Sequence, residues 1–148
     1  MPLSKDAREI LRATFELLAE GGKPRVVTIG YLTEAQLADI NQKRTDQGLH
    51  ALESPEIVLL GKHLYESRVT RDGYTIEDVC DQIESALSSE SVAIATNKMT
   101  ALRNKTPRSD RYGNQVRDEA VLELTQRRPK AELYSVIPKG DKNSPKSR

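Results

Sequence analysis

Alternation of apolar and polar positions predicts helices in the first part of the chain. Apolar residues recur at helical spacing over residues 5–20, and a Gly-Gly pair follows. Residues 25–32 (RVVTIGYL) are rich in β-branched side chains and predict a strand. The sequence TEAQ at 33–36 fits a capping box, so a second helix should begin there and end at Gly48.

The middle of the chain contains one ambiguous and one clear segment. Residues 55–68 begin with a proline that can open a helix, and we favour a helix there. The alternative is that EIVLL, at 56–60, forms a short buried strand, because periodicity does not separate the two structures in so short a run. Residues 76–88 place apolar side chains on one helical face after Thr75, which can cap the helix.

The last third of the chain predicts strands. SVAIA at 91–95 is a short strand candidate, and residues 97–109 are basic and aperiodic, which predicts a loop. A Gly-Asn turn in DRYGNQV predicts a hairpin. Residues 116–125 and 131–138 alternate and predict two antiparallel strands.

This order predicts an α+β fold in which N-terminal helices pack on a small C-terminal antiparallel sheet. We expect one domain over residues 1–138, within which the helix in residues 1–24 is either integral or peripheral. Residues 139–148 (KGDKNSPKSR) predict a disordered basic tail.

Composition narrows the class of protein. The chain has 148 residues, the size of one ordinary domain, and 36% of them are apolar. No run approaches about eighteen apolar residues, so we expect no membrane span, and the N-terminus lacks the apolar region of a secretory signal. The single cysteine, Cys80, forms no internal disulfide and should be a small core residue. These features favour a cytoplasmic location.

Charge is distributed unevenly along the chain. Residues 1–97 contain ten lysines and arginines against sixteen aspartates and glutamates, whereas residues 98–148 contain thirteen against six. The net charges are therefore −6 and +7. A basic half predicts a polyanionic partner such as RNA, and the acidic N-terminal part is a candidate surface for a protein partner. The alternative is a solvated basic tail that balances an acidic body.

The segment GKHLYESRVTRDGYT, residues 61–75, holds one of the two histidines. Histidine supplies an acid or base near neutral pH, and arginine stabilises the charge that develops on a phosphate during metal-free phosphodiester cleavage. His63, Arg68 and Arg71 are therefore the candidate catalytic residues. Helical spacing brings Glu66 near His63 but does not by itself bring the arginines there. The alternative is that His63 is a structural residue on a helix surface.

Cations spaced along the basic part can neutralise successive phosphates, and Tyr112 could stack on a base. The candidate nucleic-acid-binding residues are Lys98, Arg103, Lys105, Arg108, Arg111, Arg127 and Arg128. No signature of a sequence-reading nucleic-acid module is present, and neither are nucleotide-binding loops, hydrolase elbows or zinc-protease motifs. We expect no metal and no cofactor.

The stretch HLYESRVTRDGYTIEDVCDQIESAL, residues 63–87, resembles the helical region of small phage and mobile-element proteins related to ribonuclease toxins of the barnase, colicin and RelE-like group. In that group a histidine-bearing helix and an adjoining helix precede a short antiparallel sheet with basic residues. The layout match covers about residues 55–137. It implies His63 as acid or base, Arg68 or Arg71 as a phosphate contact, RNA as substrate and no metal. This chain differs in its acidic N-terminal third and in lacking a second histidine near the sheet.

Three hypotheses follow from these observations. The chain is a metal-independent ribonuclease of toxin type, a mobile-element accessory, immunity or inhibitor protein that binds a protein partner, or a non-specific nucleic-acid binder.

Overall fold

The computed structural model describes residues 3–95, 100–124 and 130–140. Its helices are α1 (Ala7–Ala19), α2 (Glu34–Asp46), α3 (Lys62–Leu64), the π-helix η1 (Tyr65–Arg71) and α4 (Ile76–Ala86). Its strands are β1 (Val27–Tyr31), β2 (Glu56–Leu59), β3 (Val92–Ala95), β4 (Thr100–Arg103), β5 (Arg108–Ser109), β6 (Gln115–Leu124) and β7 (Ala131–Gly140).

All of these strands join one sheet of seven, in the order β1-β2-β7-β6-β4-β3, and β5 pairs with β6. Every pair is antiparallel except β2 with β7, which is parallel. The parallel pair is short, because β2 contacts only the first two residues of β7. Beyond that point the chain leaves the sheet and continues into α3, while β7 runs on beside β6.

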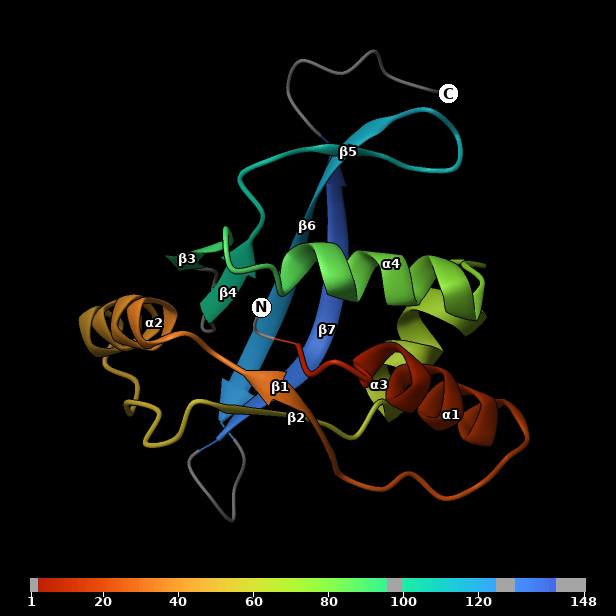
Figure 1. Cartoon of the computed structure of the whole chain (residues 1–148), viewed down its shortest axis with the longest axis horizontal. Helices are drawn as coiled ribbons and strands as arrows, with labels where there is room; N and C mark the ends of the chain where they lie inside the picture. Colours follow the sequence, from red (N-terminus) through yellow and green to blue (C-terminus); the bar gives the residue numbers. More distant parts are fainter. Residues whose placement is uncertain (1–2, 96–99, 125–129, 141–148) are drawn as a thin grey trace.

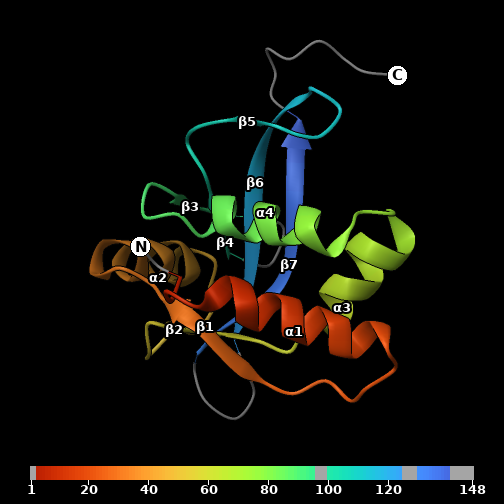
Figure 2. The same ribbon diagram turned by 45° about the vertical axis from the view of Figure 1, so that its right-hand side comes forward.

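The helices form a layer on one side of the sheet. Figures 1 and 2 show α4 crossing in front of β6 and β7, with α1 on the same side. Phe15 of α1 and Ile83 of α4 are fully buried in the core between these layers. At the far edge, α2 packs on β3, where the Asp39 carboxylate accepts a hydrogen bond from the Ala93 amide (3.1 Å). That bond caps an amide of the edge strand, which would otherwise be open to pairing.

The other side of the sheet carries the strand residues that lie between the core positions. Ala120 and Leu122 of β6 belong to the core cluster on the helix side. Side chains alternate along a strand, so Glu119 and Val121 face the opposite side, which we call the outer face. Arg103 of β4 is paired in register with Glu119 and lies on the outer face as well.

Most of the predicted elements are present. The strand near 25–32 and the helices near 5–20, 33–47 and 76–88 are confirmed. Both predicted capping residues, Thr33 and Thr75, form capping boxes with the residue three positions later. The SVAIA strand, the hairpin and the last two antiparallel strands are also confirmed. α1 is integral to the core, because Leu11 and Phe15 are fully buried.

Four predictions need correction. The helix favoured over 55–68 is wrong for its first part: residues 56–59 form β2, a strand whose last three residues are buried. The predicted loop at 97–109 contains β4, which pairs on both sides, and β5, which pairs with β6. The sheet is mixed and larger than predicted, because β1 and β2 from the N-terminal half join it. β7 continues to Gly140, two residues into the predicted tail, and residues 141–148 lie outside the described part.

Candidate functional site

A groove of about 330 Å³ lies between α3 and β7, where the chain leaves the sheet after β2. Its lining comes from two segments about seventy residues apart in the sequence. They are Leu60, Gly61, Lys62, His63, Leu64 and Glu66 on one side, and Glu132, Leu133 and Tyr134 on the other. The groove therefore exists only because β2 and β7 are neighbours in the sheet.

Gly61 sets the direction in which α3 leaves the sheet. Its φ of 89° lies in the left-handed region, which glycine adopts without a steric penalty. A Cβ at this position would lie 3.1 Å from Thr14 Cγ2 and 3.4 Å from Leu18 Cδ1 of α1. Both the backbone angle and the close approach to α1 require a glycine immediately before the helix that carries His63.

The His63 imidazole is exposed and stacks on the Tyr134 ring, with 4.2 Å between the ring centroids and 14° between the planes. Its Nε2 atom lies 3.4 Å from the Ser67 hydroxyl oxygen. Ser67 belongs to η1, the π-helix that begins two residues after His63. Single π-helical turns are uncommon and are often found at functional sites. His63 is thus held by one ring and one hydroxyl rather than by an ion pair.

A β-bulge aims Tyr134 into the groove. Val121 of β6 is paired with Ser135, but the next residue, Leu122, is paired with Leu133. Tyr134 is the extra residue of β7, and the bulge places it beside Ser135 on the outer face of the sheet. Such irregularities re-aim side chains, which here brings the Tyr134 ring under the imidazole of His63.

Glu132 is the carboxyl group of the groove whose pKa is displaced. Burial raises its pKa above the ordinary value for glutamate, and the negative charge of Glu123 raises it further. These two glutamates are directly opposite each other on β6 and β7, where like charges repel. A carboxyl group with a raised pKa in a groove is a candidate acid or base.

The groove also carries charged groups without ion-pair partners among the described residues. Lys62 and Glu66 are exposed at its rim, and neither lies within ion-pair distance of an opposite charge in the described part of the chain. Sequence reasoning did not find Lys62, Glu132 or Tyr134 as site residues. No local signal marks Glu132 or Tyr134, because what singles them out is the register of β7 against a distant segment.

The two predicted catalytic arginines do not line this groove. Arg68 is buried and forms an ion pair with Asp72 (2.9 Å), and Arg71 binds the same carboxylate (3.0 Å). These cations lower the pKa of Asp72, with the hydrogen bond from Arg71 as the main cause. The structure therefore separates Arg68 and Arg71 from His63 and ties both to the turn after η1.

Most of the described cations of the basic segment are also paired. Arg103 binds the buried carboxylate of Glu119 (2.6 Å). Arg108 forms two hydrogen bonds with the fully buried Asp118 (2.6 and 3.1 Å). Lys105 is exposed and has no ion pair among the described residues. Three other predicted binding residues, Lys98, Arg127 and Arg128, lie outside the described part.

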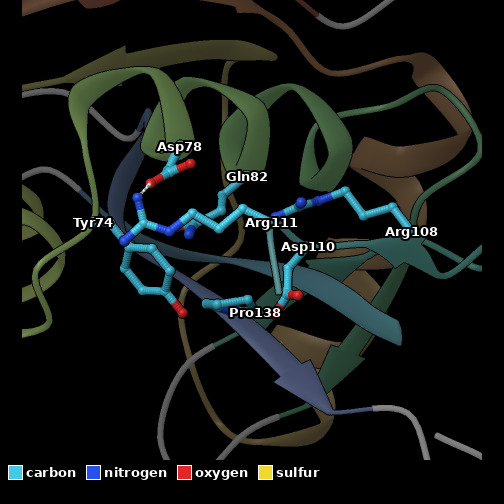
Figure 3. A pocket seen from close by; sticks show the side chains of 7 residues that line it. All are labelled: Tyr74, Asp78, Gln82, Arg108, Asp110, Arg111 and Pro138. Carbon is cyan, nitrogen blue, oxygen red and sulfur yellow. Dashed lines mark ion pairs between the residues drawn. The ribbon is translucent and has the colours of Figure 1, made fainter. Parts of the chain in front are cut away.

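Arg111, the remaining predicted cation, borders a small hollow between α4 and the β5–β6 hairpin. It forms an ion pair with Asp78 (3.0 Å), as Figure 3 shows, and its guanidinium lies 5.0 Å from the centre of the Tyr112 ring. The hollow measures about 10 Å³, which is enough for a single water molecule. The Gln82 side-chain oxygen at this site is buried and lacks a partner among the described residues. A water molecule would satisfy this oxygen, and the hollow has no room for a larger ligand.

The carboxylates of α4 are used within the fold. Arg8 of α1 binds Glu77, Asp81 and Glu84 at 2.9, 2.8 and 2.6 Å, and Arg12 binds Glu77 at 2.7 Å. Hydrogen bonds from Arg12 and Arg8 lower the pKa of Glu77 to about 2. This part of the acidic half therefore joins α1 to α4.

In the described ranges, no three histidine, cysteine, aspartate or glutamate side chains are grouped so that they could hold a metal ion. Within the same ranges, no helix has both the length and the apolar character needed to cross a bilayer. Cys80 is fully buried, and burial raises the pKa of its thiol to about 11. Comparison with protein-family models, curated proteins and solved structures found no match.

Proposed function

We propose that the protein cleaves RNA without a metal ion, with His63 and Glu132 as the acid–base pair. The observation that carries this proposal is that these two groups, from distant segments, line one groove together with Lys62. Metal-free phosphodiester cleavage needs a base, an acid and a cation near the phosphate. The groove supplies all three: Glu132 as the base, His63 as the acid and Lys62 as the cation.

The reaction is an internal transfer at phosphorus. The ionised Glu132 carboxylate accepts the proton of the ribose 2′-hydroxyl, whose oxygen attacks the adjacent phosphorus. The bond from phosphorus to the 5′-oxygen breaks, and protonated His63 donates its proton to that leaving oxygen. The products are a 2′,3′-cyclic phosphate and a free 5′-hydroxyl. Lys62 stabilises the additional negative charge on the phosphorane oxygens.

Tyr134 and Ser67 act as positioning residues in this scheme. The stack on Tyr134 fixes the plane of the imidazole, and the Ser67 hydroxyl lies near Nε2. A proton donor held in one orientation contributes more to catalysis than a freely rotating one. In the chain order, the segment with His63 is followed by α4 and by the antiparallel strands β3, β4, β6 and β7. This order agrees with the layout of the ribonuclease toxins that the sequence resembles.

The alternative of a protein partner recognised through the acidic part has less support. The cluster of Glu77, Asp81 and Glu84 on α4 is already bound by Arg8 and Arg12. A partner would have to displace these ion pairs before it could use the carboxylates.

The test is cleavage of a mixed RNA pool in EDTA by the full chain. We expect cleavage by the wild type and a loss of about 10²- to 10⁴-fold in His63→Ala, the usual contribution of one acid–base group. His50→Ala is the matched control, because His50 is the other histidine, is also exposed, and lies outside the groove. It should cleave like the wild type. Absence of cleavage by the folded wild type, or equal loss in both variants, would overturn the proposal.

A further inference from the structure

Two cations lie side by side on the outer face of the sheet. The pairing register places Arg117 of β6 directly opposite Lys139 of β7. Their neighbours Asp118 and Pro138, also a register pair, lie on the helix side, where Asp118 binds Arg108. By alternation, Arg117 and Lys139 point to the outer face.

This pair is not neutralised within the described structure. Neither Arg117 nor Lys139 forms an ion pair with any described residue, whereas Arg103, Arg108 and Arg111 each do. Like charges directly opposite on neighbouring strands destabilise a sheet. The fold therefore retains an unfavourable pair in which Arg117 is half-buried and Lys139 is exposed.

Lys105 extends this pair into a row. Arg103 is paired with Glu119, and the Asn104 amide donates a hydrogen bond to the Asp118 carbonyl (3.2 Å). The next residue, Lys105, is exposed in the connection between β4 and β5, one position from this hydrogen bond, just as Arg117 is one position from it on β6. We call Lys105, Arg117 and Lys139 the basic row. Neighbouring strands lie about 4.8 Å apart, so Arg117 and Lys139 place two positive charges a short interval apart on β6 and β7.

We propose that the basic row binds phosphates of the RNA strand whose cleaved bond lies in the groove at His63. Glu132 and Tyr134 of the groove face the same outer side as Lys139. Lys139 follows Tyr134 by five positions on β7, a distance of about 17 Å along the strand. A single RNA strand lying along β7 would reach both places. This inference rests on the proposed function, because it assigns the occupant of the outer face from the substrate of the groove.

The experiment measures binding separately from cleavage. A short fluorescent single strand of 2′-O-methyl RNA keeps the phosphates but lacks the 2′-hydroxyl proton needed for cleavage. Binding to the full chain is followed by anisotropy over a range of salt concentrations. For single strands, each phosphate contact contributes about 0.7 to the slope of log K against log salt. We expect Arg117→Ser and Lys139→Ser each to reduce the slope by about 0.7.

Lys23→Ser with Arg25→Ser is the matched control, because this lysine and arginine are exposed, also lack ion pairs among the described residues, and lie in the connection before β1. Its slope should equal that of the wild type.

Lys139→Glu provides a second variant: it should weaken binding further while raising Tm, because it replaces a repulsion with an attraction. On cleavable RNA, the Arg117 and Lys139 variants should raise KM and leave kcat unchanged.

Equal slopes for wild type, Arg117→Ser and Lys139→Ser would overturn the inference, as would an equal reduction in the control. Neither result bears on cleavage in EDTA, which His63→Ala tests. Conversely, a wild type that binds through the basic row but cleaves no RNA would overturn the catalytic proposal and leave the phosphate contacts in place.

Discussion

The basic segment around β4 and β5 and the groove beside α3 differ in how their charges are used. In the basic segment, Arg103, Arg108 and Arg111 each lie within 3.0 Å of a carboxylate, and two of those carboxylates are buried. In the groove, Lys62, Glu66 and Glu132 have no ion pair among the described residues.

This difference teaches that a count of cations in a sequence does not measure the charge available to a ligand. Arg108 is needed to neutralise Asp118, which is fully buried on the helix side of the sheet. Such a pair contributes to folding and leaves little charge for a phosphate. Lys62 has no such partner in the described chain, so its charge is available in the groove.

The largest expected effect tests the paired region. Arg108→Ala should lower the free energy of unfolding by about 3–5 kcal/mol at neutral pH, because it leaves the Asp118 carboxylate buried without its partner. Burial already raises the pKa of Asp118, and the variant loses the hydrogen bond and the positive charge of Arg108, which oppose this shift. The variant should therefore regain stability as the pH is lowered and Asp118 becomes protonated. Urea denaturation at several pH values measures both effects.

Arg111→Ala is the control for this prediction. Arg111 also binds an aspartate, Asp78, but its side chain is 41% exposed and that of Asp78 is 21% exposed. Exposed pairs contribute little to stability, so Arg111→Ala should cost far less than Arg108→Ala. If Arg108→Ala and Arg111→Ala cost the same, the distinction between structural and available cations fails.

The next effect tests the groove. Glu132→Gln should lower kcat/KM for RNA by about 10²-fold, or about 2.7 kcal/mol, without loss of stability. Stability is retained because the pKa of Glu132 is raised in the folded protein. Because the pKa is raised in the fold, ionisation of Glu132 opposes folding as the pH rises through its folded value, and glutamine removes that cost. Cleavage rates and thermal unfolding at neutral pH check the two parts.

Glu123→Gln sharpens this test. Glu123 is opposite Glu132 and contributes to its raised pKa, after burial. The acidic limb of the pH–rate profile should therefore move to lower pH in Glu123→Gln, while kcat at neutral pH is retained. An unchanged acidic limb would show that Glu132 is not the base.

The sequence predicted local structure well, because local signals carried it. The capping boxes at Thr33 and Thr75 and the alternation in β6 and β7 are all encoded within a few residues. β2 was only the alternative to a favoured helix, because a short apolar run fits either structure equally, and its pairing with β7 decided the outcome. The sequence identifies His63 as a candidate site residue, but it does not identify Glu132 and Tyr134. These two residues reach the groove only through a parallel strand pair and a β-bulge.

The smallest expected effect concerns Gly61, the groove residue that joins β2 to α3. Gly61→Ala must keep a φ of 89° and place its Cβ 3.1 Å from Thr14 Cγ2. The left-handed angle alone costs about 1–2 kcal/mol. Gly48→Ala has the same cost, since its φ is 76°, but its Cβ would meet nothing within 4 Å. Gly61→Ala should therefore be the less stable of the two variants. It alone should also reduce cleavage, because α3 must move away from α1 to relieve the contact, and this movement separates His63 from Tyr134. Equal cleavage by the two variants would show that the groove does not depend on how α3 leaves the sheet.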